Sequence, residues 1–150
     1  MAETVFDHQG TLDKFMGDSL MALWGAPIPF EDKELLAVRC ALDMRSALQK
    51  LNAERATRQE PPLSVGMGLS AGFVVAGNLG SERRIDYTVI GEEVNLASRL
   101  CEKAAPGQIL VSEPVYKKLK GRVAALALNP FLLKGIPEPV KAHEIKDLVS

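Results

Sequence analysis

The sequence predicts a single domain of the α+β class, residues 1–150, because helical and strand patterns alternate along the chain. Three stretches carry this prediction. Residues 31–52 contain an apolar stripe of helical period, residues 63–70 alternate with a period of two, and residues 77–100 pass from a strand pattern into a helical one. A hydrophobic content of 47%, with 25% charged residues, suffices for one packed core.

The first 24 residues predict the end of a helix followed by a β-hairpin. Residues 1–8 are expected to be helical. Residues 11–16 and 19–24 are expected to be strands joined by Gly17-Asp18, a pair typical of tight hairpin turns. The apolar residues of this hairpin, Phe15 among them, are candidates for the core.

Residues 31–52 are expected to form a long helix that packs on a sheet. Asp32 is a candidate N-cap for this helix. Residues 53–62 are polar and end in two prolines, which predicts a surface loop. The apolar stripe recurs every three or four residues and consists of Ala37, Ala41, Met44, Leu48 and Leu51.

Residues 63–70 are expected to be a strand with one apolar face and one nearly bare face. The bare face carries Gly66 and Gly68. Because glycine leaves room above a strand, a backbone segment or a ligand is expected to lie close against this face. Residues 73–76 predict a further strand.

The remaining elements are short. Residues 77–81 are rich in glycine and predict a turn, residues 85–90 predict a strand, and a helix is expected from Gly91 onward. The later expectations are a strand at 108–111, a helix at 113–120 with Ser112 as its N-cap, strands at 123–128, 131–133 and 140–145, and a turn at 135–137.

Composition argues against several classes of protein. The net charge of −1 provides no basic surface for a nucleic acid. No apolar run approaches the roughly 18 residues that a membrane-spanning helix needs. Cys40 and Cys101 lack metal-ligand spacing and are expected to be reduced thiols. His8 and His143 are isolated, and neither is assigned a catalytic role.

Asn95 and Arg99 are the first candidates for binding chemistry. They lie four residues apart, so they share one face of the predicted helix. An amide and a guanidinium on one face suit a sugar hydroxyl and a phosphate. Taken alone, the pattern is also typical of a solvated helix face.

The amino-acid sequence around this helix resembles that of a known family. Residues 84–91 (RIDYTVIG) and 94–100 (VNLASRL) closely resemble the signature of class III nucleotide cyclases, the adenylate and guanylate cyclase catalytic domains. Residues 14–18 (KFMGD) and 133–135 (LKG) match further motifs of that family in the same order. The resemblance covers nearly all of the chain, and it implies a ferredoxin-like antiparallel sheet with helices on one face.

The resemblance also implies a reaction and a set of site residues. Such domains convert ATP or GTP into the 3′,5′-cyclic monophosphate and pyrophosphate, with two Mg²⁺ or Mn²⁺ ions in each complete site. The implied roles are Asp18 for metal, Lys14 and Thr88 for the base, Asn95 for the ribose, Arg99 for the α-phosphate, Lys134 for the terminal phosphates, and Arg83 or Arg84 as a contribution from a partner subunit.

The purine is expected to be adenine. Adenine presents an N6 donor and an N1 acceptor, to which a lysine can donate and from which a threonine hydroxyl can accept. Guanylate cyclases typically carry Glu and Cys where this sequence has Lys14 and Thr88, so the resemblance is to bacterial adenylate cyclases that use threonine. Because a hydroxyl can also donate, a guanylate cyclase is the alternative.

The family resemblance implies partners and a location as well. The expected substrate is ATP, and each active site is expected at the interface of a homodimer or of a pair with another cyclase domain. An upstream sensor or regulatory domain is expected in the parent protein. The catalytic domain is expected in the cytoplasm, including where a parent is attached to a membrane.

The sequence departs from the family at its N-terminus. The first strand, which carries the first metal-binding aspartate, and part of the first two helices have no counterpart, and neither Glu3 nor Asp7 matches that aspartate. The chain is therefore expected to be a fragment, a mis-assigned start or a degenerate copy. Little activity is expected of this chain on its own, and its exposed sheet edges are expected to cause association. The alternatives are a non-catalytic nucleotide-binding or dimerisation module and a generic ferredoxin-like interaction domain.

Overall fold

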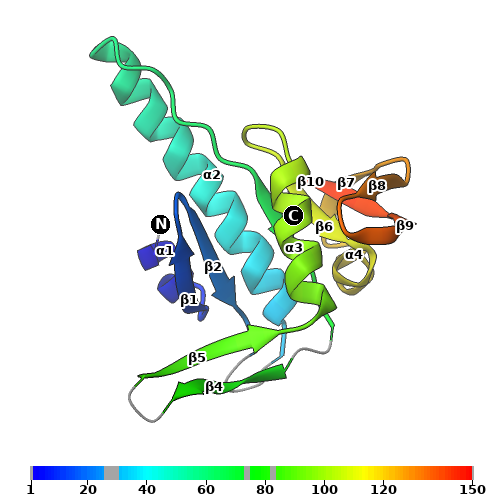
Figure 1. Ribbon diagram of the computed structural model, residues 1–150. Coiled ribbons are helices and arrows are strands. Elements are labelled where there is room, and N and C mark those ends of the chain that lie inside the picture. Colours follow the sequence, from blue (N-terminus) through cyan, green and yellow to red (C-terminus); the bar gives the residue numbers. More distant parts are fainter. Residues whose placement is uncertain (1, 26–30, 73–74, 82–83, 150) are drawn as a thin grey trace.

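The computed structural model describes residues 2–25, 31–72, 75–81 and 84–149 (Figure 1). The helices are α1 (Ala2–Asp7), α2 (Lys33–Thr57), α3 (Glu92–Lys103) and α4 (Glu113–Leu119). The strands are β1 (Thr11–Met16), β2 (Ser19–Leu23), β3 (Met67–Leu69), β4 (Val75–Ser81), β5 (Arg84–Ile90), β6 (Ile109–Ser112), β7 (Val123–Ala127), β8 (Phe131–Leu133), β9 (Ile136–Val140) and β10 (Ala142–Leu148). The predicted α+β class is confirmed.

A four-stranded sheet forms the centre, with the order β3-β6-β10-β7. Strand β3 runs parallel to β6, whereas β10 pairs antiparallel with both β6 and β7. Three hairpins stand apart from it as two-stranded sheets: β1–β2, β4–β5 and β8–β9. Figure 1 shows α2 running through the length of the molecule and the hairpin β4–β5 extending away from the body.

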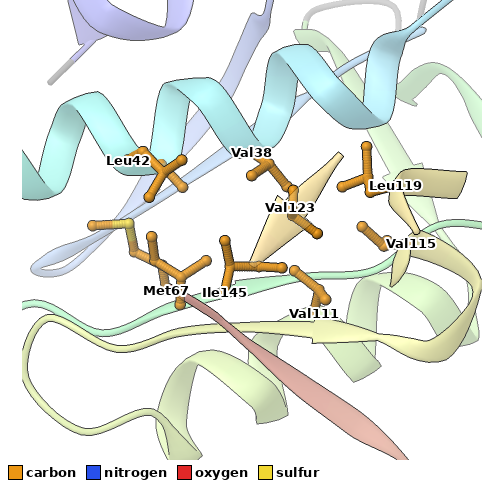
Figure 2. Packing of buried hydrophobic residues seen from close by; sticks show 10 residues of the cluster. Val38, Leu42, Met67, Val111, Val115, Leu119, Val123 and Ile145 are labelled. Atoms are coloured by element: carbon orange, nitrogen blue, oxygen red, sulfur yellow. The ribbon is translucent and has the colours of Figure 1, made fainter. Parts of the chain in front are cut away.

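Helices α2 and α4 pack on one face of the central sheet through the main hydrophobic core (Figure 2). Its labelled members are Val38 and Leu42 from α2, Met67 from β3, Val111 from β6, Val115 and Leu119 from α4, Val123 from β7 and Ile145 from β10. Burial of each such side chain contributes about 1.5–3 kcal/mol, so this cluster is a large source of hydrophobic stabilisation.

The helical stripe predicted for α2 is largely confirmed. Ala37, Ala41 and Leu48 are buried. Leu51 is 39% exposed, because the C-terminal end of α2 projects beyond the sheet (Figure 1). The helix also continues to Thr57, so part of the predicted surface loop is helical.

Helix α3 covers the opposite face of the sheet, so the helices are not confined to one face as the family resemblance implies. It also approaches β3 backbone to backbone. A Cβ atom added to Gly68 would lie 2.4 Å from the Cys101 nitrogen and 2.5 Å from the Ala97 carbonyl oxygen. One added to Gly66 would lie 2.8 Å from the Ala104 carbonyl oxygen. The predicted close approach to the bare face of this strand is therefore confirmed, and the α3 backbone is what lies there.

The strand predicted over residues 63–70 is shorter than expected. Only Met67–Leu69 pairs with the sheet. The preceding segment is held by α2 instead, because the Asn52 side chain donates to the Leu63 carbonyl oxygen and accepts from the Leu63 nitrogen. The Asn52 side chain thus forms the backbone hydrogen bonds that a neighbouring strand would form if this segment belonged to the sheet.

Two predicted turns lie elsewhere. Residues 77–81 belong to β4, where Gly77 pairs with Thr88 and Gly80 with Ile85. Strand pairing with β-branched residues outweighs the turn preference of the glycines here. In the hairpin β8–β9 the turn is Lys134-Gly135, so the predicted turn at 135–137 falls mostly within β9.

The hairpin β1–β2 is confirmed, with Gly17-Asp18 at its turn. It is anchored through α1, because the Trp24 indole nitrogen donates to the His8 carbonyl oxygen at 2.9 Å. The His8 ring in turn lies 2.8 Å from the Asp43 carboxylate on α2. The core prediction for Phe15 is wrong: its side chain is 65% exposed, because no described element covers that side of the hairpin.

His143 and Glu113 tie α4 to β10. Nε2 of His143 lies 2.8 Å from the Glu113 carboxylate, and the His143 ring stacks on Tyr116 with centroids 3.8 Å apart. The hydrogen bond to His143 lowers the pKa of the Glu113 carboxyl. That His143 has no catalytic role stays a prediction. Its contacts with Glu113 and Tyr116 give it a structural role.

We predict that Gly68→Ala lowers the free energy of unfolding by about 3 kcal/mol, because the added methyl group forces the α3 backbone off the sheet. Chemical denaturation measures the change. Ser98→Ala, on the exposed side of the same helix, is the control and should shift stability by less than about 0.5 kcal/mol. Equal stability of the two variants would show that α3 is not held by this contact.

Candidate functional site

Helix α3 presents the amide and the guanidinium that the sequence singles out. Its inward side carries Leu96 and Leu100, which pack in a second core cluster. Asn95 is exposed and Arg99 is partly exposed, so both lie away from that cluster. The shared face predicted for this pair is consistent with their positions on one helix that is firmly seated on β3.

Arg99 is held by a partner on its own helix. Its Nη1 atom lies 3.1 and 3.3 Å from the two carboxylate oxygens of Glu102. The arginine side chain is 32% exposed and the glutamate side chain 62% exposed. A pair of this kind contributes less than about 1 kcal/mol, so an anionic ligand can replace Glu102 at little cost.

Lys14 and Asp18 lie on the hairpin β1–β2. Asp18 is exposed at the turn beside Gly17, whose φ of 60° is a conformation that glycine adopts without strain. Lys14 is exposed on β1, and its Nζ atom lies 3.6 Å from Oδ2 of Asp13. In Figure 1 this hairpin and α3 lie on different sides of α2. These four residues therefore form two separate groups, Lys14 with Asp18 on the hairpin and Asn95 with Arg99 on α3.

Lys134 lies in the exposed turn between β8 and β9, apart from both groups. Thr88 pairs with Gly77 and Arg84 with Ser81 in the hairpin β4–β5, and their side chains lie outside the described part of the structure. Arg83 lies outside the described residues altogether. The roles predicted for these residues stay predictions.

Arg45 lines two surface pockets of about 270 and 240 Å³. Among the predicted site residues whose side chains are described, none lines either pocket. These two pockets therefore do not enclose the predicted residues that the structure describes, and Lys14, Asp18, Asn95 and Lys134 are exposed in the single chain.

The metal role of Asp18 stays a prediction. Within the described ranges, no group of three or more His, Cys, Asp and Glu residues is arranged to hold an ion. Mg²⁺ is usually bound through one or two carboxylates together with substrate phosphates. Asp18, exposed at its turn, fits such a shared site, whereas a site made by this chain alone does not fit the described residues.

Glu93 is a partly buried residue with one buried carboxylate oxygen, and the sequence pattern does not single it out. Its Oε2 atom is buried and has no hydrogen-bond partner among the described residues. The carboxylate lies over Gly72, where an added Cβ would be 2.7 Å from Cγ of Glu93. The Ser70 hydroxyl donates to the Glu93 carbonyl oxygen. Burial raises the pKa of the Glu93 carboxyl, the Ser70 hydroxyl partly offsets that rise, and Glu92 adds to it.

Both cysteines are free, as predicted. Burial raises the pKa of the Cys40 thiol to about 11, and burial also raises the pKa of the Cys101 thiol. The Cys101 sulfur donates to the Gly66 carbonyl oxygen. Because a thiolate is the reactive form, these pKa values argue against cysteine chemistry at neutral pH.

Comparison with protein families gives a match over most of the chain. A family described as the adenylate and guanylate cyclase catalytic domain matches residues 5–147. An uncharacterized protein of Mycobacterium tuberculosis (strain H37Rv) is 41% identical over 117 residues, which make up 75% of this chain and 20% of that protein. An uncharacterized protein of Mycobacterium bovis is 38% identical over 107 residues, covering 70% and 18%. The chain thus spans about a fifth of the length of these curated relatives.

Solved structures give the same result for the fold. The adenylyl cyclase CyaB from P. aeruginosa is 32% identical, with a TM-score of 0.92 over 97% of this chain and 76% of that one. The guanylyl cyclase Cya2 is 35% identical, with a TM-score of 0.86 over 99% and 75%. A bacterial light-regulated adenylyl cyclase is 26% identical, with a TM-score of 0.78 over 96% and 71%. None of the described helices is long and apolar enough to cross a membrane.

We predict that Glu93→Gln stabilises the protein at neutral pH and not in acid. The folded state raises the pKa of this carboxyl, so the native protein binds the proton more tightly than the unfolded chain. The stability of the wild type therefore falls as the pH rises above the ordinary carboxyl value of 4.5. Denaturation at a series of pH values measures the difference between variant and wild type.

The matched control is Glu138→Gln, which neutralises an exposed carboxylate on β9. Its stability difference from the wild type should show no such growth with pH. A Glu93→Gln difference that is constant across the pH series would contradict the assigned cause.

Proposed function

Because the chain belongs to the adenylate and guanylate cyclase catalytic domain family, we propose that it is the catalytic part of an adenylate cyclase. In this proposal two chains, or one chain and a related cyclase domain, bind ATP between them. The products are 3′,5′-cyclic AMP and pyrophosphate. The proposal is narrower than family membership, since the similar solved structures include an adenylyl and a guanylyl cyclase.

The observation that carries the proposal is the placement of Asn95 and Arg99. Both lie on α3 away from the second core cluster, and the helix is held by its close backbone contact with β3. Groups on a rigid helix keep a constant spacing, and fixed donors stabilise developing charge at no cost of reorganisation. An amide and a guanidinium so placed suit a ribose and an adjacent phosphate.

The reaction follows from these donors. In this proposal the ribose 3′-oxygen gives its proton to water and forms a bond to the α-phosphorus, while the bond from that phosphorus to the bridging oxygen of the β-phosphate breaks and pyrophosphate leaves. Asn95 would donate to the ribose and orient it for in-line attack. Arg99 would donate to the α-phosphate oxygens, on which charge builds up. Lys134, with Arg83 or Arg84 of a second chain, would neutralise the departing pyrophosphate.

Base recognition is assigned to Lys14 and Thr88. The ammonium group donates to N1 of adenine, and the hydroxyl accepts from the N6 amino group. Asp18 would hold Mg²⁺ or Mn²⁺ together with the substrate phosphates. When bound, such an ion supplies charge neutralisation and favours loss of the 3′-hydroxyl proton.

A shared active site is supported by the separation of the two groups in one chain. Lys14 and Asp18 lie on the hairpin β1–β2, and Asn95 lies on α3 with Arg99 (Figure 1). A second chain would bring the complementary group to each. The greater length of the curated relatives supports the further proposal that a sensor or regulatory domain accompanies this unit in the parent protein.

A second candidate is a cyclase-like module that binds nucleotide or dimerises without turnover. The observation that favours it is that the described residues contain no group of three or more His, Cys, Asp and Glu side chains arranged to hold a metal ion. Such a module would bind ATP and release no cyclic product.

We predict that Arg99→Ala lowers the formation of cyclic AMP about 100-fold or more, because it removes a donor that acts on the developing charge. Because little activity is expected of this chain alone, the assay mixes it with a complete cyclase domain whose own counterpart of Arg99 is substituted. It follows product from ATP in the presence of Mn²⁺, with ATP binding measured in parallel by calorimetry. Arg58→Ala removes an equal charge from the C-cap of α2 and is the control.

The results separate the candidates. Turnover that depends on Arg99 supports the cyclase. Binding of ATP without turnover by the wild-type chain supports the non-catalytic module, and a preference for GTP supports a guanylate cyclase. An Arg99→Ala variant as active as Arg58→Ala would contradict the proposed site.

A further inference from the structure

Strand β1 is irregular one residue before the lysine that we assign to the base. Leu12 pairs with Ala22 and Lys14 pairs with Met21, so Asp13 is the additional residue of a β-bulge. In a regular strand, neighbouring side chains point to opposite faces. A bulge suspends this alternation, so that the side chains of two neighbouring residues can meet.

Asp13 and Lys14 do meet. Nζ of Lys14 lies 3.6 Å from Oδ2 of Asp13. The Asp13 side chain is fully buried, at 0% exposure, whereas the Lys14 side chain is 43% exposed. Neither oxygen of Asp13 accepts a hydrogen bond from the described residues. Because burial of a carboxylate without hydrogen bonds is costly, the adjacent ammonium group supplies the charge that offsets it.

We propose that Asp13 is a positioning residue that holds the Lys14 ammonium group for base recognition and so sets the preference for adenine over guanine. The inference rests on the proposed function, in which Lys14 donates to the purine. Asp13 acts through the lysine, because its own carboxylate is buried and cannot reach a ligand.

The physical reason lies in the two purine edges. Adenine offers an acceptor at N1, where guanine carries an N–H donor and places its acceptor at O6. An ammonium group that is held in place meets one of these acceptors. Without the Asp13 carboxylate the ammonium group loses one of the contacts that restrict it, so the ability to distinguish the bases falls while the charge of the lysine is kept.

The first experiment measures the dissociation constants of ATP and GTP, in Mn²⁺, for the wild type, Asp13→Asn, Lys14→Met and the double variant. Asp13→Asn should lower the preference for ATP by about threefold to fivefold, the range for a partly exposed ion pair. The double variant should match Lys14→Met. Asp7→Asn, which removes an exposed charge from α1, should leave the preference unchanged.

The second experiment measures the melting temperature of the same four proteins without nucleotide. Lys14→Met should lower Tm by about 3–6 °C, because the Asp13 charge stays buried without its cation. The double variant should recover most of this loss. This measurement tests the ion pair without any appeal to nucleotide binding.

The inference is overturned if Asp13→Asn leaves the preference unchanged, if its effect adds in full to that of Lys14→Met, or if the double variant is no more stable than Lys14→Met. A wild type that prefers neither purine, together with a coupled change in Tm, shows that the ion pair is real and that the proposed adenylate function has failed.

Discussion

The contact on which the rest of the structure depends is the close approach of the α3 backbone to strand β3. Gly66 and Gly68 present no side chain, so main-chain atoms of Ala97, Cys101 and Ala104 occupy the space that a Cβ would fill. A contact of this kind leaves no freedom of rotamer or repacking, and any added atom must displace a backbone. It therefore fixes both the height and the rotation of α3 on the sheet.

The consequences extend to the candidate site. Once Leu96 and Leu100 point into the second core cluster, Asn95 and Arg99 lie on the remaining side of the helix. The first turn of the helix is also held against the Ser70–Gly72 segment by Glu93. This contact costs free energy, because one buried carboxylate oxygen of Glu93 has no hydrogen-bond partner among the described residues. Rigidity at this end of α3 is what a fixed pair of donors requires.

The hairpin β1–β2 is held in place in a different way. It belongs to no larger sheet in the described structure and is held through Trp24 and His8 to the helices. Its polar residues are arranged by a bulge, which brings Lys14 beside the buried Asp13. One group of candidate residues is thus positioned by close packing and the other by local charge. The two groups share no element, which is the arrangement expected of a site completed by a second chain.

The sequence by itself determined the α+β class, the positions of most helices and strands, and the family, because helical and strand periodicity and short motifs are local properties of the chain. It also indicated that something lies close against the glycines of β3. Only the tertiary structure decided that α3 is that element, that Phe15 is exposed, and that residues 63–66 follow α2 instead of joining the sheet. The sequence also did not predict the bulge at Asp13 or the buried oxygen of Glu93. Pairing register and desolvation depend on residues that are distant in the chain.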